Sequence, residues 1–264
     1  MMSLSQAAKV IDAQLVGEDI TFTGVSTDTR SIEPGQLFVA LRGENFDGHQ
    51  FLSQAQEKGA VAAMVDASSE SSLSQLVVGD TRLGLGQLAA SWREKFDIPL
   101  VAITGSNGKT TVKEMTASIL RQAGDVLATA GNFNNDIGMP LTLFRINQQH
   151  RAAVIEMGAN HHGEIDYLTQ LAKPTVAVIT NAGSAHLEGF GSIEGVSRAK
   201  GEIYAGLVDD GIAVINADDD YADYWRSLNS KRKVVSFGMD MSADISASVS
   251  LSQGIQTLAL NTPQ

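Results

Sequence analysis

The residue types best suited to chemistry gather in one short stretch, Gly105, Ser106, Asn107, Gly108, Lys109, Thr110 and Thr111. An apolar run at 100–103 precedes it and is typical of a buried strand, and the apolar spacing over 109–122 predicts a helix after it. Backbone N–H groups at the start of a helix bind anions, and small residues let a phosphate approach them closely. The stretch is therefore predicted to be a phosphate-binding loop, with Lys109 at the terminal phosphates and the Thr110 hydroxyl on a magnesium ion.

This loop departs from the general phosphate-loop pattern at one position. The pattern requires a glycine five residues before the second glycine, and Ile103 stands there. We interpret the loop as a shortened G-x-x-G-K-T form, because the predicted strand, turn and helix around it are those of a general phosphate loop. An ordinary glycine turn with a surface lysine is the alternative. The apolar face of the following helix is predicted to comprise Val112, Met115, Ile119, Leu120 and Ala123.

Three further residues follow or flank the other predicted strands. Glu156 ends a predicted strand at 152–156, and a carboxylate at this position can hold magnesium directly or through water. The alternative is an acidic residue that only starts a loop. His186 follows a strand at 175–180 and is a candidate metal or phosphate contact, with a structural or solvated histidine as the alternative. Lys200 lies on a predicted helix, and a lysine held near a metal can lose its proton and react.

The elements that position these residues alternate regularly in the second part of the chain. Strands are expected at 100–104, 152–156, 175–180, 211–215 and 233–237. Helical segments or loops lie between them, and this alternation implies a parallel sheet covered on both faces, with ligands at the carboxyl ends of its strands. The tail from Asp244 to Leu260 alternates in polarity and predicts a hairpin. No closing element follows it, so we expect the natural protein to continue.

The first part of the chain mixes short helices and strands. Helices are expected at 4–15 and 51–58, and strands at 20–27, 36–41, 61–65 and 75–78. A helix over 82–96 then leads into the phosphate-loop strand, which places the domain boundary near Asp80. The predicted fold class is α/β, with a small mixed α/β N-terminal domain at 1–80 and a P-loop-type central domain with a mostly parallel sheet at 81–264.

The composition excludes several classes of function. The 264 residues contain no cysteine, which excludes disulfides, thiol catalysis and cysteine-ligated zinc. A net charge of −11 argues against a general nucleic-acid or anionic-membrane surface. The sequence shows no signal peptide and no apolar run of about 20 residues that could span a bilayer, so we expect a cytoplasmic protein. The remaining histidines lack a comparable context and are expected at the surface: His49, His150, His161 and His162.

Several motifs together resemble one family, the ATP-dependent Mur ligases of peptidoglycan precursor synthesis. The resemblance covers essentially the whole chain. It rests on Ser26-Thr-Asp-Thr-Arg30, Leu37-Phe-Val-Ala-Leu-Arg-Gly43, Asp47-Gly-His49, Thr104-Gly-Ser-Asn-Gly-Lys-Thr-Thr111, Gly131-Asn-Phe-Asn-Asn-Asp-Ile-Gly138, Glu156-Met-Gly-Ala-Asn160, Ala185-His-Leu-Glu-Gly-Phe-Gly191 and Ala199-Lys-Gly-Glu-Ile203. The shortened phosphate loop is the usual form in this family.

The resemblance implies three domains, of which this sequence holds two. The first domain binds the UDP end of a nucleotide-sugar, and the residues that resemble its contacts are Ser26, Thr27, Asp28 and Arg30. The loop at 131–140 is either an ordinary turn-rich connection or part of a substrate channel, and in the second case its substrate residues are Asn132, Asn135 and Asp136. The third domain closes over the ATP site and helps to bind the amine. Its absence implies that the isolated chain is inactive.

The implied chemistry is amide-bond formation driven by ATP and Mg²⁺. A carboxylate of a UDP-N-acetylmuramoyl-tripeptide attacks the γ-phosphorus, and the amine of D-Ala-D-Ala displaces phosphate from the resulting acyl phosphate. By resemblance, Thr110 and Glu156 sit at one magnesium ion, and His186 and a carbamylated Lys200 sit at the second. These roles would make Lys109, His186 and Lys200 catalytic residues. The resemblance also implies a monomeric enzyme that serves cell division and cell shape.

Three alternatives stay open. A sibling Mur ligase that adds the third amino acid is disfavoured by the asparagine-rich loop at 131–138 and by the run Glu156–Asn160. A polyglutamate or cyanophycin synthetase is disfavoured by the Asp-Thr-Arg and Leu-Phe-Val-Ala-Leu motifs of the first domain. A nucleotide-binding module without turnover belongs to another class, and it would tolerate changes at Glu156, His186 and Lys200 alike.

Overall fold

The structure is a computed structural model that describes residues 1–184, 187–239, 242–252 and 255–262. Packing divides the chain into two compact units. We call them the N-terminal unit, Met1–Phe96 with Asp136–Arg145, and the central unit, Asp97–Asn135 with Ile146–Gln264. The α/β class and the mostly parallel sheet predicted from the sequence are both confirmed.

Helix α3 (Thr81–Arg93) packs within the N-terminal unit, whereas the sequence suggests a boundary before it, near Asp80. It contacts α1 (Leu4–Val10) and α5 (Gly138–Leu143). Its side chains Leu85 and Leu88 are fully buried. The chain therefore leaves the central unit after Asn135, returns to the N-terminal unit over Asp136–Arg145, and continues the central unit from Ile146.

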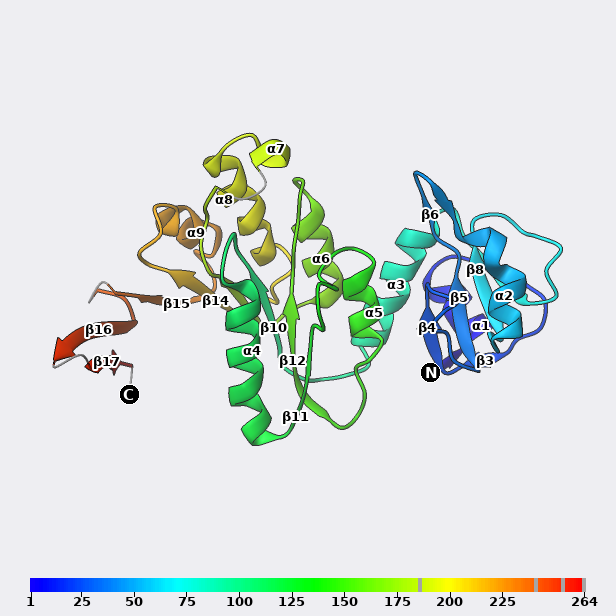
Figure 1. The fold of residues 1–264 in the computed structure, drawn as a ribbon, viewed down its shortest axis with the longest axis horizontal. Helices are drawn as coiled ribbons and strands as arrows, with labels where there is room; N and C mark the ends of the chain where they lie inside the picture. Colours follow the sequence, from blue (N-terminus) through cyan, green and yellow to red (C-terminus); the bar gives the residue numbers. More distant parts are fainter. Residues whose placement is uncertain (185–186, 240–241, 253–254, 263–264) are drawn as a thin grey trace. The chain divides into compact units, whose positions relative to one another are not determined.

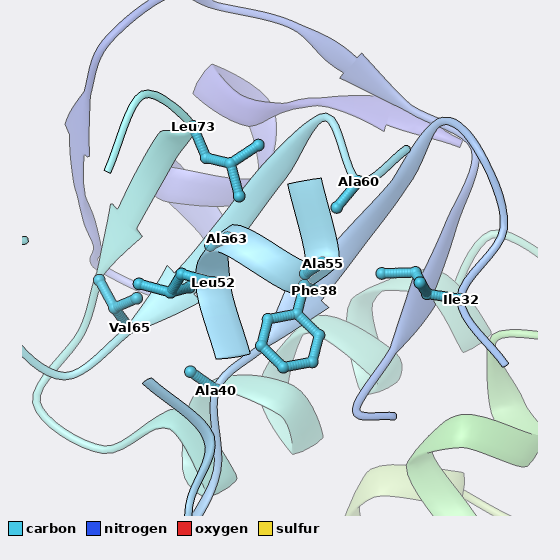
Figure 2. Close-up of a cluster of buried hydrophobic side chains, with 9 residues drawn as sticks. All are labelled: Ile32, Phe38, Ala40, Leu52, Ala55, Ala60, Ala63, Val65 and Leu73. Carbon is cyan, nitrogen blue, oxygen red and sulfur yellow. The ribbon is translucent and has the colours of Figure 1, made fainter. Parts of the chain in front are cut away.

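The N-terminal unit is built on a five-stranded sheet in the order β2-β9-β8-β5-β4. These strands are β2 (Gln14–Val16), β4 (Gly24–Ser26), β5 (Gln36–Val39), β8 (Ala62–Val65) and β9 (Ser74–Val77). The neighbours pair in parallel except β2 with β9. Helix α2 (Leu52–Glu57) lies over the strands, and Figure 2 shows the apolar cluster between them, which includes Phe38, Leu52 and Ala63.

Two predictions for this unit are wrong in detail. The helix expected over 4–15 ends at Val10, because Asp12 adopts a positive φ of 50° and the next residues pair with β9 as strand β2. The strand expected over 20–27 is split into β3 (Thr21–Phe22) and β4. β3 pairs with β1 (Met2–Ser3) and β4 pairs with β5, so the two halves belong to different sheets.

The central unit holds an eight-stranded sheet in the order β11-β12-β10-β13-β14-β15-β16-β17 (Figure 1). Its strands are β10 (Leu100–Thr104), β11 (Asp125–Ala128), β12 (His150–Glu156), β13 (Val176–Ile179), β14 (Ile212–Asn216), β15 (Lys233–Gly238), β16 (Ile245–Ser252) and β17 (Ile255–Asn261). All pairs from β11 to β16 are parallel, and β16 and β17 form the predicted antiparallel hairpin. The five predicted central strands are confirmed.

Helices cover this sheet on both faces. α4 (Lys109–Leu120) connects β10 to β11, and α6 (Glu164–Ala172) connects β12 to β13 in the opposite direction along the sheet. Because parallel crossovers are right-handed, the two helices lie on opposite faces. The other helices described in this unit are η2 (Arg121–Ala123), α7 (Leu187–Phe190), α8 (Ile193–Gly201), η3 (Glu202–Tyr204) and α9 (Ala222–Leu228).

The buried face of α4 differs from the predicted one. Met115 and Ile119 are 62% and 66% exposed, whereas Lys113 and Ala117 are buried against the sheet. Lys113 can replace an apolar residue there because its aliphatic stem packs inside and its ammonium donates to the Thr129 carbonyl at 2.7 Å. Val112 and Leu120 do pack on the core as predicted.

Within the part of the chain that the structure describes, no helix combines the length and the apolar character needed to cross a membrane.

Candidate functional site

The loop between β10 and α4 is held in place by residues that follow β13. The Ser106 and Asn107 amides donate to the carbonyl and side-chain oxygens of Asn181, each at 3.0 Å. Thr180 Oγ1 donates to the Asn107 carbonyl at 2.6 Å, and the Gly183 amide donates to Ser106 Oγ at 2.8 Å. The loop backbone is therefore fixed by the segment after β13, and the start of α4 beside it is suited to bind an anion.

Both glycines of this loop are required by its backbone. Gly105 has a φ of +148°, and a Cβ there would lie 1.9 Å from Thr180 Oγ1. Gly108 has a φ of +79° and directly precedes α4, with open space where a Cβ would be. Left-handed backbone and close approach are both conditions that glycine meets at least cost.

Lys109 and Thr110 begin α4 and point to different partners. The half-buried Lys109 ammonium donates to the Gly105 carbonyl at 2.7 Å. Burial lowers the pKa of Lys109, and the nearby Glu156 carboxylate partly opposes this shift. Thr110 Oγ1 donates to Glu156 Oε2 at 2.9 Å. A lysine, a hydroxyl and a carboxylate thus meet beside the phosphate loop.

Glu156 is the centre of this arrangement. It is only 3% exposed, at the carboxyl end of β12. Besides Thr110, its carboxylate accepts from Asn134 Nδ2 at 2.9 Å, and its amide donates to Thr129 Oγ1 at 3.0 Å. Carboxylate and hydroxyl oxygens are the hard donors that Mg²⁺ prefers, and Mg²⁺ commonly takes one or two protein oxygens plus phosphates and waters. The residues present therefore fit a magnesium ion carried by a nucleotide.

Lys200, at the end of α8, is 1% exposed. Burial and, to a lesser degree, the positive charge of Lys109 lower the pKa of Lys200 to about 8, against the opposing effect of Glu202 and Glu164. Its ammonium lies 5.6 Å from the centre of the Phe190 ring. A lysine of this kind is readily deprotonated and able to react. His186, the other residue expected at a second metal, lies outside the described residues.

A second concave site lies wholly within the N-terminal unit. It is a pocket of about 550 Å³ lined by Thr27, Asp28, Thr29, Arg30, Phe38, Phe46, Phe51 and Gln54. The Arg30 guanidinium binds Asp28 through Nε and Nη2, and this contact lowers the pKa of Asp28. Ser26 Oγ accepts from the Asp28 amide at 3.2 Å and so fixes the turn. Three of the four predicted nucleotide-sugar residues line this pocket, and Ser26 supports it.

A model of the Mur ligase middle domain matches residues 103–262, and a model described as the Mur ligase family, catalytic domain, matches residues 21–92. The chain belongs to the Mur ligase family. The family resemblance seen in the sequence is thereby confirmed, and the two matched regions of this Mur ligase chain contain the two sites just described.

Curated relatives are similar to this Mur ligase over most of its length. The UDP-N-acetylmuramoyl-tripeptide–D-alanyl-D-alanine ligase of Escherichia coli (strain K12) is 51% identical over 236 residues, which cover 89% of this chain and 52% of the relative. The ligase of the same name from Haemophilus influenzae is 52% identical over 249 residues, covering 92% and 54%. The chain spans about half the length of the curated relatives it matches.

Solved Mur ligase structures share the fold. A crystal structure of MurF from Acinetobacter baumannii is 38% identical with a TM-score of 0.92, covering 99% of this chain and 58% of the other. MurF from Thermotoga maritima in complex with ADP is 31% identical with a TM-score of 0.83, covering 93% and 57%. The likeness therefore extends through both units.

The structure also shows where the loop residues of the Mur ligase lie. Asn132 and Asn135 are exposed. Asp136 forms an ion pair with Arg82 on α3 within the N-terminal unit. The residue that does reach the loop site is Asn134, which was not among the predicted site residues. The sequence around Asn134 does not distinguish it from the adjacent asparagines. Which of these asparagines contacts Glu156 depends on the conformation of the backbone turn, which the sequence pattern does not indicate.

We expect Glu156→Ala to raise the magnesium requirement for nucleotide binding. Loss of the carboxylate removes one of two protein oxygens for the ion, so the magnesium concentration that half-maximally strengthens ADP binding should rise about tenfold or more. The affinity for ADP without magnesium should stay the same. Titration calorimetry over a magnesium series measures both values. Glu194→Ala, which removes an exposed carboxylate of the same unit, is the matched control, and an unchanged magnesium dependence in Glu156→Ala would remove this residue from the metal site.

Proposed function

We propose that this chain carries the nucleotide-sugar and ATP sites of a ligase that joins D-Ala-D-Ala to UDP-N-acetylmuramoyl-tripeptide. The observation that carries the proposal is the group formed by Lys109, Thr110 and Glu156 at the phosphate loop. The names of the relatives similar to this chain support the choice of substrates. Because those relatives are about twice as long, the complete reaction requires parts that this chain does not match.

The side chains at the loop would act on charge and position. Lys109 would leave the Gly105 carbonyl to neutralise the terminal phosphates as the tripeptide carboxylate attacks the γ-phosphorus. The backbone amides at the start of α4 would orient the phosphates for in-line attack. Thr110 and Glu156 would hold Mg²⁺, which supplies positive charge to the phosphate oxygens. This attack would release ADP and leave an acyl phosphate, from which the D-Ala-D-Ala amine would displace inorganic phosphate as the amide bond forms.

We further propose that Lys200 is carbamylated and holds a second magnesium ion together with His186. Burial favours the neutral amine of Lys200, which can attack CO2 to form an N–C bond and release a proton. The product is a carbamate, an anion with two oxygens. An ammonium group would repel Mg²⁺, whereas the carbamate oxygens can bind it. Protein incubated with ¹³C-bicarbonate should show a carbamate carbonyl signal in NMR. The signal should vanish in Lys200→Arg and persist in Lys233→Arg, an exposed control; a wild-type protein without the signal would contradict this role.

Two sibling activities are less well supported. A UDP-N-acetylmuramoyl-L-alanyl-D-glutamate–2,6-diaminopimelate ligase is 22% identical to this chain with a TM-score of 0.62, and a folylpolyglutamate synthase from Mycobacterium tuberculosis is 17% identical with a TM-score of 0.52. Identities this low indicate the shared fold alone.

Titration calorimetry of this chain with the UDP-linked tripeptide, run beside the dipeptide form, tests the substrate assignment. Tighter binding of the tripeptide is expected. Equal affinities would show that only the UDP end is bound by this chain and would keep the sibling ligase open. Binding of neither compound would contradict the role of the 550 Å³ pocket.

A further inference from the structure

The motif Asp47-Gly48-His49 has no part in the function proposed so far, although the structure gives each of its residues a specific contact. The sequence places His49 at the surface, and this is wrong, because its side chain is only 13% exposed. His49 Nδ1 lies 2.7 Å from Asp47 Oδ1. His49 Nε2 lies 3.2 Å from the Asp66 amide, which can only donate. His49 Nε2 also lies 3.1 Å from Asp66 Oδ1, so the imidazole ring connects Asp47 to Asp66.

Arg42 closes the same network from the other side. Its Nη1 donates to Asp47 Oδ2 at 2.7 Å, and its Nε and Nη2 donate to the two carboxylate oxygens of Asp66. The hydrogen bonds from His49 lower the pKa of Asp47, and the bond from Arg42 lowers the pKa of Asp66. Both carboxylates thus remain charged partners at neutral pH. We call Arg42, Asp47, His49 and Asp66 the hairpin clamp.

Gly48 allows the backbone beside the hairpin clamp to approach Leu41 closely. Its amide donates to the Leu41 carbonyl at 2.8 Å. A Cβ on Gly48 would lie 2.8 Å from both the nitrogen and the carbonyl oxygen of Leu41. Only glycine lets the chain pass so close to its own backbone, which explains why this residue separates the aspartate from the histidine.

The clamp fixes a hairpin that is too short to be stable alone. β6 (Arg42–Gly43) and β7 (Phe46–Asp47) pair over two residues each. Isolated two-stranded hairpins are marginally stable in water even when they are longer. Arg42 and Asp47 lie directly opposite each other in this pairing, so the clamp holds both strands to Asp66, which follows β8.

Phe46 is the residue of this hairpin that faces the pocket. It lines the 550 Å³ pocket and stacks on Phe51, with ring centres 5.4 Å apart and planes at 14°. It is also 51% exposed, so packing around it does not by itself fix its place. The neighbouring residue, Asp47, belongs to the clamp and connects Phe46 to it.

We propose that His49 is a positioning residue for the nucleotide-sugar pocket, where it holds the 42–47 hairpin so that Phe46 forms a fixed wall for the UDP end of the substrate. This role rests on the function proposed above for the pocket. It assigns His49 no contact with substrate. The side chain acts through Asp47 and the hairpin, and through Asp66 at the end of β8.

A double-mutant cycle with UDP as the titrant tests this role. We expect His49→Ala to weaken UDP binding about five- to tenfold, because a mobile wall must be ordered on binding. Phe46→Ala should weaken binding to a similar degree. In the Phe46→Ala background, His49→Ala should have no further effect, since interacting residues are non-additive when one acts through the other. His49→Gln, which retains an acceptor for the Asp66 amide, should restore part of the affinity, and the exposed His161→Ala is the control.

A readout without ligand separates this inference from the proposed function. Hydrogen exchange of the 42–47 amides should be faster in His49→Ala, while exchange in β5 and β8 stays at the wild-type rate. Unchanged exchange at 42–47, unchanged UDP affinity, or an equal loss of affinity in the Phe46→Ala background would each overturn the inference. Failure of the wild-type chain to bind UDP would instead refute the function proposed for the pocket, and the exchange rates would still decide whether His49 fixes the hairpin.

Discussion

Lys109→Ala is expected to abolish ATP-dependent turnover in a full-length enzyme that contains this chain, and to weaken binding of a non-hydrolysable ATP analogue by this chain about 10- to 100-fold. The ammonium lies at the loop, 2.7 Å from the Gly105 carbonyl, within reach of phosphates bound at the start of α4. Hydrogen bonds to charged groups contribute about 1.5–3 kcal/mol each, which corresponds to this range of affinity. Because the lysine serves the terminal phosphates, the loss should be smaller for ADP and near zero for AMP. Titration calorimetry with the three nucleotides measures the gradient.

The control for this variant is Lys233→Ala, which removes an exposed lysine of the same unit. It should bind all three nucleotides as the wild type does. An equal loss for the ATP analogue and AMP in Lys109→Ala would indicate general damage to the loop. Undiminished affinity for the analogue would refute the assignment of this stretch as a phosphate loop.

Gly105→Ala is expected to produce the largest loss of stability among single changes at the loop. The new methyl group would lie 1.9 Å from Thr180 Oγ1, the atom that donates to the Asn107 carbonyl. Relief of this overlap requires movement of the loop away from β13, in addition to the cost of a left-handed alanine. Left-handed backbone costs about 1–2 kcal/mol and overpacking about 1–3 kcal/mol, so we expect a decrease of about 2–5 kcal/mol in the free energy of unfolding. Denaturant titration measures it.

Gly108→Ala is the matched comparison, because this glycine also has a positive φ, but no atom of the described residues lies within 4 Å of an added Cβ. It should lose only the backbone part, about 1–2 kcal/mol. Equal losses in the two variants would show that the contact between the loop and Thr180 is not tight in solution.

The middle of the central sheet was predictable from the sequence because β10 and β12 are buried along most of their length. Such strands are continuous apolar runs, as at Val154 and Ile155, and they need no knowledge of their neighbours. The phosphate loop was predictable for a related reason. Its glycines and its Lys-Thr pair are required by local backbone geometry and by phosphate chemistry, which act within a few residues.

Features that depend on distant partners were not predictable. Lys113 looks like a solvent-exposed residue on α4, but the Thr129 carbonyl accepts its ammonium inside the fold. His49 looks like an isolated histidine, because its partner Asp66 lies 17 residues away in the sequence. The strand expected over 20–27 is split because its two halves pair with β1 and β5. In each case a tertiary contact determines which side chain is buried or where a strand ends. The spacing of apolar and polar residues in the sequence does not indicate that contact.

Product analysis of the ligation reaction tests the central claim most directly. The protein to use is a chimera of this chain with the part of the Escherichia coli relative that follows its matched region, and this chain alone is the matched control. With ATP, Mg²⁺, the UDP-linked tripeptide and D-Ala-D-Ala, mass spectrometry should detect the UDP-linked pentapeptide from the chimera and none from the chain alone. Formation of a tripeptide product from the dipeptide substrate and diaminopimelate, or no product despite binding of ATP and tripeptide, would contradict the proposed function.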